Sequence, residues 1–292
     1  MTTAAPTLCV FTPTYNRAYI LPALYESLLA QTSTDFQWMI VDDGSTDDTE
    51  SLVQGWIAEG RLSIDYVKQE NGGKLAQPTR VSPAVAASCS SSWIQTTTSC
   101  RPRWSMFSRV GKRSEAMTPS PESLPCAAPM STPPWHVDAR RVRAVTLWDL
   151  HEKMGFRGDT SLIHRTEILR RYPFEVAPGE KFVAESSVWF LIDESYNMLT
   201  DNEILTICHY LPDGLTQNFA SNAKRNPIGY WKHKRYCAAR STTLKSRARE
   251  TSLFLVGCML AHQKGAISMA PSKALAVVCY PVALVARYTM FR

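Results

Sequence analysis

The sequence predicts an α/β protein with a half-Rossmann parallel sheet at its N-terminus, a disrupted middle segment and a mostly helical C-terminal part. Three observations lead to this prediction. Residues 1–74 alternate between buried-strand and helix patterns, residues 75–140 keep neither pattern, and residues 141–292 return mainly to helical spacing. Alternation of strand and helix indicates a parallel sheet with right-handed crossovers. We expect the last region to complete the domain that the first begins.

The first region is predicted to fold as a βαβαβ unit. Short apolar runs that end at turn residues predict strands at 8–11, 36–41 and 64–67. Leucines at helical spacing predict a helix over 20–31, and a second helix should follow the second strand. Thr46 or Asp47 is expected to cap that helix, because their side chains can accept the N–H groups at a helix start.

The middle region differs in composition. Residues 75–140 hold 9 of the 18 prolines and 12 serines but only three acids. No apolar period lasts more than a few residues, and proline removes the N–H that a central strand needs. We therefore expect an irregular, poorly ordered segment that contributes no strand to the sheet.

Order returns in the third region. Apolar spacing predicts helices over 147–154, 166–171 and 185–192, and a strand over 204–208. The tail, 274–286, is apolar but contains Pro281, and it falls short of the roughly 20 apolar residues that a membrane span needs. A packed or amphipathic helix is the better interpretation of this tail.

Charge and cysteine content limit the class of protein. Residues 1–74 carry 4 basic and 10 acidic side chains, whereas 141–292 carry 21 and 13. An acidic N-terminal region argues against nucleic-acid binding. The basic run at 224–249 is ordinarily a solvated face, with peripheral contact to a membrane surface as the alternative. Eight scattered cysteines without metal spacing, and no signal peptide, predict a cytoplasmic protein, or one lying at the inner membrane face.

Polar residues gather where the predicted strands end. Ligands of open α/β sheets bind beyond the carboxyl ends of the strands. Asp42 and Asp43 follow the second strand, and a carboxylate there can accept a base N–H or ribose hydroxyls. Tyr15 can stack on a base, and Lys74, after two glycines, can meet phosphate oxygens. A turn-shaping role for Asp42 is the alternative.

Three segments resemble the nucleotide-binding motifs of family-2 glycosyltransferases. They read TPTYNR at 12–17, VDDGSTD at 41–47 and NGGK at 71–74. The resemblance implies the GT-A fold and inverting transfer from a UDP- or GDP-linked sugar to a glycan or lipid-linked acceptor, usually with Mg²⁺ or Mn²⁺. It also implies that Asp43, with Asp42, holds the base while Thr12 and Tyr15 line the nucleoside pocket.

A fourth segment, GEKFVAE at 179–185, is similar to the family segment that carries the acceptor-activating carboxylate. Inverting transfer needs one carboxylate to take the proton of the attacking hydroxyl. The resemblance assigns this role to Glu185. The alternative is a helix-start acid that the helix dipole favours.

One family motif is missing. The family implies an Asp-x-Asp about twenty residues after Gly-Gly-Lys, yet no acid lies between Lys74 and Glu115, so no metal ligand is assigned. Read one base over, the codons of Trp93 and Ile94 give GAT, an aspartate, and the same frame permits Asp-Ser-Asp-Asp after an apolar run. We infer a local frameshift within residues 75–140.

The main hypothesis is therefore a glycosyltransferase that this frameshift has deprived of its metal acids. Two alternatives remain open, a sugar-nucleotide-binding module without catalysis and a membrane-surface interaction protein.

Overall fold

The structure is a computed structural model that describes residues 8–71, 92–95, 123–130, 144–156, 158–200, 205–206 and 218–292. The chain divides into two compact units. The first comprises Met1–Pro173 and Val188–His209, and the second comprises Phe174–Ser187 and Tyr210–Arg292. The predicted boundaries near residues 74 and 140 fall outside the described residues and stay a prediction.

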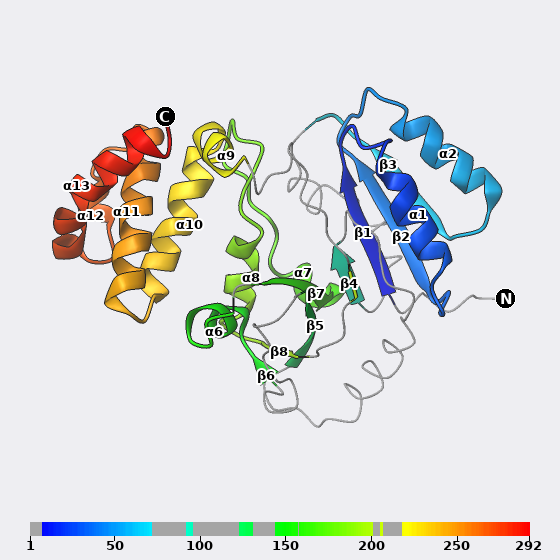
Figure 1. Cartoon of the computed structure of the whole chain (residues 1–292), viewed down its shortest axis with the longest axis horizontal. Coiled ribbons are helices and arrows are strands. Elements are labelled where there is room, and N and C mark those ends of the chain that lie inside the picture. The colour runs from blue at the N-terminus through cyan, green and yellow to red at the C-terminus, as the bar shows by residue number, and fades with distance from the viewer. Residues whose placement is uncertain are drawn as a thin grey trace. The chain divides into compact units, whose positions relative to one another are not determined.

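The first unit is built on an eight-stranded sheet in the order β3-β2-β1-β4-β7-β5-β8-β6 (Figure 1). Its strands are β1 (Leu8–Thr14), β2 (Phe36–Asp42), β3 (Ile64–Lys68), β4 (Ser92–Gln95), β5 (Ser123–Met130), β6 (Ala144–Val145), β7 (Asp159–Arg165) and β8 (Asn197–Leu199). β1 pairs in parallel with β2 on one side and with β4 on the other. β7 then runs antiparallel to β4. The sheet is thus parallel from β3 to β4 and mixed from β7 onward.

Helices α1 (Leu21–Leu29) and α2 (Thr49–Glu59) connect the first three strands, which confirms the predicted βαβαβ unit. Of the two predicted caps of α2, Asp47 accepts an N–H at the helix start, that of Thr49, at 3.1 Å. It lies one residue before Asp48, which directly precedes the helix and makes no capping bond with its side chain. Gly60, in the left-handed conformation, ends α2.

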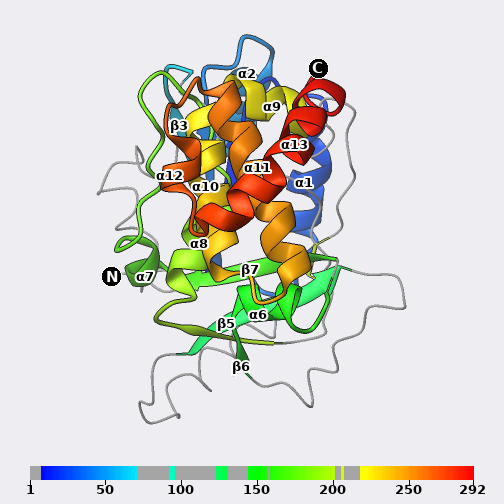
Figure 2. The same ribbon diagram turned by 90° about the vertical axis from the view of Figure 1, so that its left-hand side faces the viewer.

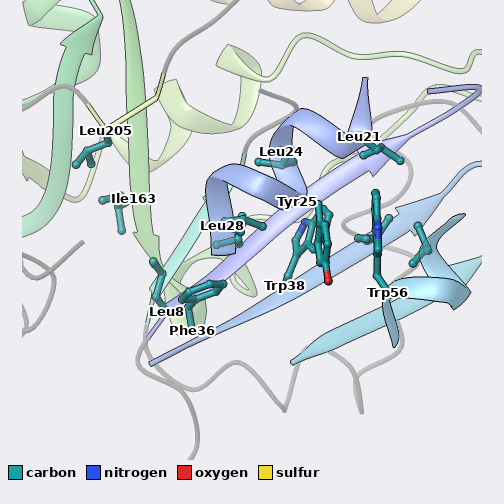
Figure 3. Packing of buried hydrophobic residues seen from close by; sticks show 13 residues of the cluster. Leu8, Leu21, Leu24, Tyr25, Leu28, Phe36, Trp38, Trp56, Ile163 and Leu205 are labelled. Carbon is teal, nitrogen blue, oxygen red and sulfur yellow. The ribbon is translucent and has the colours of Figure 1, made fainter. Parts of the chain in front are cut away.

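The core of this unit lies between the sheet and its two crossover helices (Figure 3). Leu8 and Val10 alternate along β1 toward this side, where they meet the leucines of α1. Trp38 of β2 is fully buried, and Trp56 of α2 stacks on Tyr25 of α1 with ring centroids 4.4 Å apart. The other face of the same strands buries Cys9, Phe11, Met39 and Val41. Both faces are covered, as a parallel sheet requires.

The prediction that residues 75–140 contribute no strand is wrong in two places. β4 extends the parallel sheet beside β1, with Ser92 opposite Leu8 and Gln95 opposite Phe11. β5 pairs with β7 and with β8, although it contains Pro125 and Pro129. Its register against β7 shifts between Cys126 and Pro129. Such an irregularity is how a strand accommodates prolines that cannot donate to a ladder.

Shorter helices also belong to the first unit, although the first two residues of α8 fall in the second. They are α6 (Leu147–Glu152), α7 (Thr166–Leu169) and α8 (Ser186–Ile192), each within its predicted range. Asp193 accepts the backbone N–H groups of Leu147 and Trp148, which fixes the start of α6. Of the predicted strand at 204–208 the structure describes only Leu205 and Thr206, and Thr206 forms a bridge.

The second unit is a helical bundle of α9 (Phe219–Arg225), α10 (Pro227–Arg240), α11 (Leu244–Leu260), α12 (Ala266–Met269) and α13 (Lys273–Thr289). α11 packs against α10 and α13 around the buried Phe254, Leu255 and Phe291. Gly257 permits the close approach, since a Cβ there would lie 2.8 Å from the Trp231 side chain. The mostly helical C-terminal part is confirmed. Within the described residues, no helix is long and apolar enough to cross a bilayer.

Candidate functional site

The first three strands end at one edge of the sheet. Their parallel register sets Thr14 of β1 opposite Asp42 of β2, and Asp42 opposite Lys68 of β3. The loops after these strands therefore emerge side by side. This edge carries Tyr15, Asp42 and Asp43, and Lys74 lies outside the described residues.

Asp42 is fully buried and fully engaged with the protein. One carboxylate oxygen accepts the Ser45 N–H at 2.8 Å and the Ser45 hydroxyl at 2.5 Å, and the other accepts the Tyr66 hydroxyl at 2.6 Å. Burial, and then the bond to Asp42, raise the pKa of Tyr66 well above its ordinary value, so its hydroxyl stays a donor. These contacts make Asp42 an internal anchor of the loop.

Asp43 links all three strand ends. Its backbone N–H donates to the Thr14 carbonyl at 2.9 Å, and its carboxylate accepts the Gln69 amide at 2.9 Å. The residue is almost completely buried. Its carboxylate is therefore held in place by groups from the first and third strand ends.

Side chains also tie the first loop to the second. Asn16, at a positive φ of 51°, donates its backbone N–H to the Ser45 hydroxyl, and its side-chain oxygen accepts the Thr46 N–H, both at 2.8 Å. Asp47 accepts the Ala18 N–H at 3.0 Å. Burial acts to raise the pKa of Asp47, but its hydrogen bonds outweigh burial and lower it. The two loops thus form one connected unit.

Gly44 allows the second loop to approach the third. Its φ is +79°, and a Cβ would lie 3.1 Å from the Gln69 carbonyl oxygen and 3.2 Å from the Asn71 nitrogen. Only glycine meets both demands without strain. The sequence patterns did not identify Gln69 or Tyr66, because their roles depend on contacts across the sheet.

Thr12 and Tyr15, the two remaining residues of the predicted nucleoside pocket, differ in burial. Thr12 is buried, and its hydroxyl accepts the Trp38 indole N–H at 2.9 Å. Tyr15 is 45% exposed. Thr14 lies between them in the sequence, and its buried hydroxyl has no hydrogen-bond partner among the described residues. It belongs to the TPTYNR segment, but it was not among the predicted site residues.

Glu185 belongs to the second unit, where it directly precedes α8. Its segment is fixed to α10. The Glu180 carboxylate accepts the N–H groups of Ile228 at 2.5 Å and Gly229 at 2.8 Å, at the start of α10, where the helix dipole favours an acid. His233 of α10 lies 3.1 Å from the Ser187 hydroxyl. Burial, and then the Lys234 charge, lower the pKa of His233 to about 3, so the ring stays neutral.

The sequence of the first unit matches a known family. Residues 9–77 match the model of "Glycosyl transferase family 2". The match is confined to these residues. They cover β1 to β3 and the three loops of the site.

Curated relatives of this family-2 segment are glycosyltransferases. Validoxylamine A glucosyltransferase of Streptomyces hygroscopicus subsp. jinggangensis is 42% identical over 89 residues, which is 30% of this chain and 21% of that protein. A PGL/p-HBAD biosynthesis glycosyltransferase of Mycobacterium bovis is 48% identical over 46 residues, 16% of this chain and 18% of that protein. The chain thus spans about a fifth of the curated relatives it matches.

Solved structures resemble the whole chain. The S. aureus TarS structure has a TM-score of 0.54 at 14% identity, covering 96% of this chain and 55% of that chain. The mannosyltransferase PcManGT from Pyrobaculum calidifontis, in complex with GDP-Man and Mn²⁺, has a TM-score of 0.54 at 17% identity, covering 99% and 83%. At these identities the likeness shows the fold, and it confirms the predicted α/β class.

The family-2 segment implies a divalent cation, but the described residues do not fit one. Among them, no three His, Cys, Asp or Glu side chains are grouped closely enough to hold a metal ion. Asp42 already accepts three hydrogen bonds from the protein. β4 ends at Gln95, and the sequence has no acid from there to Glu115. We therefore assign no step of the chemistry to a metal.

Proposed function

We propose that this chain derives from a glycosyltransferase that moves a sugar from a nucleoside diphosphate sugar to an acceptor hydroxyl with inversion. The observation that carries the proposal is the family-2 edge itself, where three loops converge around the buried carboxylate of Asp43. Structural neighbours support the ligand class. One form of S. aureus TarS, at a TM-score of 0.51, is in complex with UDP, and PcManGT is in complex with GDP-Man.

On the donor side, we assign direct contact to Asp43, Tyr15 and Lys74. The Asp43 carboxylate would accept the base N–H, Tyr15 would stack on the base, and Lys74 would meet the diphosphate. Asp42 and Thr12 would support the loops without touching the nucleoside, because their polar atoms already bond to the protein. They would hold the loops in the shape that the nucleoside needs.

On the acceptor side, we assign the general base to Glu185. Its carboxylate would take the proton of the acceptor hydroxyl as that oxygen attacks the anomeric carbon. The bond from this carbon to the diphosphate oxygen would break on the opposite side, which inverts the configuration. The bonds from Glu180 and His233 to neighbouring residues would keep the base in position.

The frameshift limits what this chain can do. β4 lies beside β1 in the sheet. Its codons overlap those where the shifted frame permits aspartates after an apolar run, around codons 93–98. As given, β4 ends with Gln95 and three threonines follow in the sequence, and these side chains are poor ligands for Mg²⁺ or Mn²⁺. We therefore expect nucleotide binding with little or no transfer. A binding module without catalysis is the second candidate, and this absence of acids favours it.

Two proteins separate the candidates, the chain as given and a frame-corrected chain with one base changed near codon 75 and a compensating change between codons 135 and 146. Calorimetry should show UDP or GDP binding to both, and radiolabelled UDP- or GDP-sugars should be hydrolysed or transferred only by the corrected chain. Glu185→Gln in the corrected chain should abolish turnover while nucleotide affinity stays unchanged. Full activity in the chain as given, with its gene sequence verified, would refute the frameshift. Absence of nucleotide binding in both would refute the proposed function.

A further inference from the structure

Helix α13 presents an apolar surface away from its own bundle. Small residues, Ala276, Cys279 and Ala283, form the stripe that is buried against the rest of the second unit. The opposite side is apolar as well, and its large side chains are 57% to 72% exposed at Val277, Val278, Val282, Val285 and Tyr288. In Figure 2, α13 crosses the side of the bundle that faces the viewer, over α11. We call this exposed side the α13 face.

Exposed apolar side chains gathered on one side of a helix are typical of a docking site. The helix has 17 residues and includes Pro281, and no described helix can cross a bilayer. A helix of this kind can instead lie in the plane of a membrane surface, with its apolar side among the acyl chains.

The charge of residues 218–292, which include α13, points to the partner. Residues 218–292 carry 13 lysines and arginines and one acid, Glu250. Glu250 is buried, and its carboxylate lies 2.9 Å from the Lys234 ammonium and 2.7 Å from the Arg249 guanidinium. No carboxylate side chain of this stretch is therefore exposed. The stretch as a whole is strongly positive outside, as a surface that meets anionic headgroups should be.

Cations also stand at both ends of the helix. Lys273 begins α13 and is exposed, whereas Arg287 lies in its last turn, where its guanidinium is 5.8 Å from the centroid of the Tyr288 ring. Long basic side chains can reach headgroups while the apolar residues between them insert, and tyrosines are suited to the interface. Nothing acidic interrupts the helix.

We propose that α13 docks this chain onto a bilayer that contains anionic lipid, lying parallel to the membrane plane with the α13 face inserted. A second copy of the chain is a poorer occupant. A symmetric pair would bring two positively charged stretches together without an exposed carboxylate side chain from residues 218–292 to compensate. The proposal does not depend on the glycosyltransferase assignment.

Flotation with lipid vesicles tests the proposal on the full chain. We expect the protein to float with vesicles of phosphatidylcholine and phosphatidylglycerol and to stay behind with phosphatidylcholine alone. The double variant Val278→Asp/Val285→Asp should bind at least tenfold more weakly, because two carboxylates would enter the apolar layer. The matched control Ser51→Asp/Gln54→Asp adds the same charge at exposed positions of α2 and should bind like the parent chain.

Exposed positions were chosen so that both double variants fold, which circular dichroism checks. A charge variant, Lys264→Glu/Lys273→Glu, should also weaken binding severalfold at low salt, since both lysines are exposed. Equal flotation of Val278→Asp/Val285→Asp and the parent, or equal binding to neutral vesicles, would overturn the proposal. So would a dimer in sedimentation experiments that the same variant dissociates, because a second copy would then cover the α13 face.

Discussion

Asp42 and Asp43 are adjacent, but the structure predicts that their removal has different consequences. Asp42→Ala deprives the Ser45 N–H, the Ser45 hydroxyl and the Tyr66 hydroxyl of their acceptor. Hydrogen bonds to a charged group each contribute about 1.5–3 kcal/mol, but these three share one carboxylate and are not additive. We expect the free energy of unfolding to fall by about 3–5 kcal/mol.

Asp43→Ala removes the acceptor of the Gln69 amide, so the expected loss in stability is about 1–2 kcal/mol. Affinity for UDP or GDP should fall by about 1.5–3 kcal/mol, or roughly tenfold to a hundredfold, because the base loses a charged acceptor. Urea titrations followed by tryptophan fluorescence measure stability, and calorimetry measures affinity. Asp48→Ala is the control, since Asp48 is exposed and makes no capping bond. Unchanged affinity in Asp43→Ala, or parent-like stability in Asp42→Ala, would refute this division of roles.

Two other predictions concern pH and backbone strain. Burial lowers the pKa of His164 to about 3, and burial with the Lys234 charge does the same for His233. The unfolded state, with a histidine pKa near 6.5, therefore binds more protons below that pH. Stability should fall on acidification by about 2 kcal/mol per histidine from pH 7 to pH 5, measured by urea midpoints, and His164→Leu should reduce the slope. Gly44→Ala should cost about 1–2 kcal/mol in unfolding free energy and weaken UDP binding, because its φ is +79° and the Cβ would crowd the next loop. Gly55→Ala in α2, with nothing within 4 Å of the added Cβ, should stabilise by about 0.5–1 kcal/mol. Loss of stability in Gly55→Ala as large as in Gly44→Ala would contradict the strain argument.

The N-terminal fold was predictable because its signals are local. Strands buried on both faces appear as continuous apolar runs, and each ends at a turn residue that the chain itself supplies. The structure extends β1 from the predicted Phe11 to Thr14, since polar residues at a strand end still pair with their neighbours. The edge position of Asp42 and Asp43 follows from the parallel order alone. Which carboxylate anchors the loop depends on Tyr66 and Gln69, and no sequence period indicates such contacts across strands.

The C-terminal helices show what local sequence signals cannot predict. The tail was predictable as a helix, but its buried side was not, because α13 carries apolar residues on both its buried and its exposed side. Packing against α11 selects the stripe of Ala276, Cys279 and Ala283, since small side chains let the helices approach closely. The exposed valines are therefore a property of the tertiary structure. Composition alone placed the expected membrane contact in the basic run at 224–249.

The middle region shows that a strand can occupy its place in the sheet without supplying the side chains of a metal site. Backbone pairing with β1 holds β4 in the sheet, and pairing is available to almost any sequence there. A metal site needs carboxylates, and residues 93–98 of this chain supply none. The chain as given should thus hold a nucleoside through the Asp43 edge but bind UDP with the same affinity with and without Mn²⁺. In the frame-corrected chain, aspartates at this strand end should make UDP binding at least tenfold tighter with Mn²⁺, because a held cation offsets the diphosphate charge. Calorimetry with and without the metal compares the two proteins directly, and a Mn²⁺-dependent affinity in the chain as given would show that its diphosphate site does not need those acids.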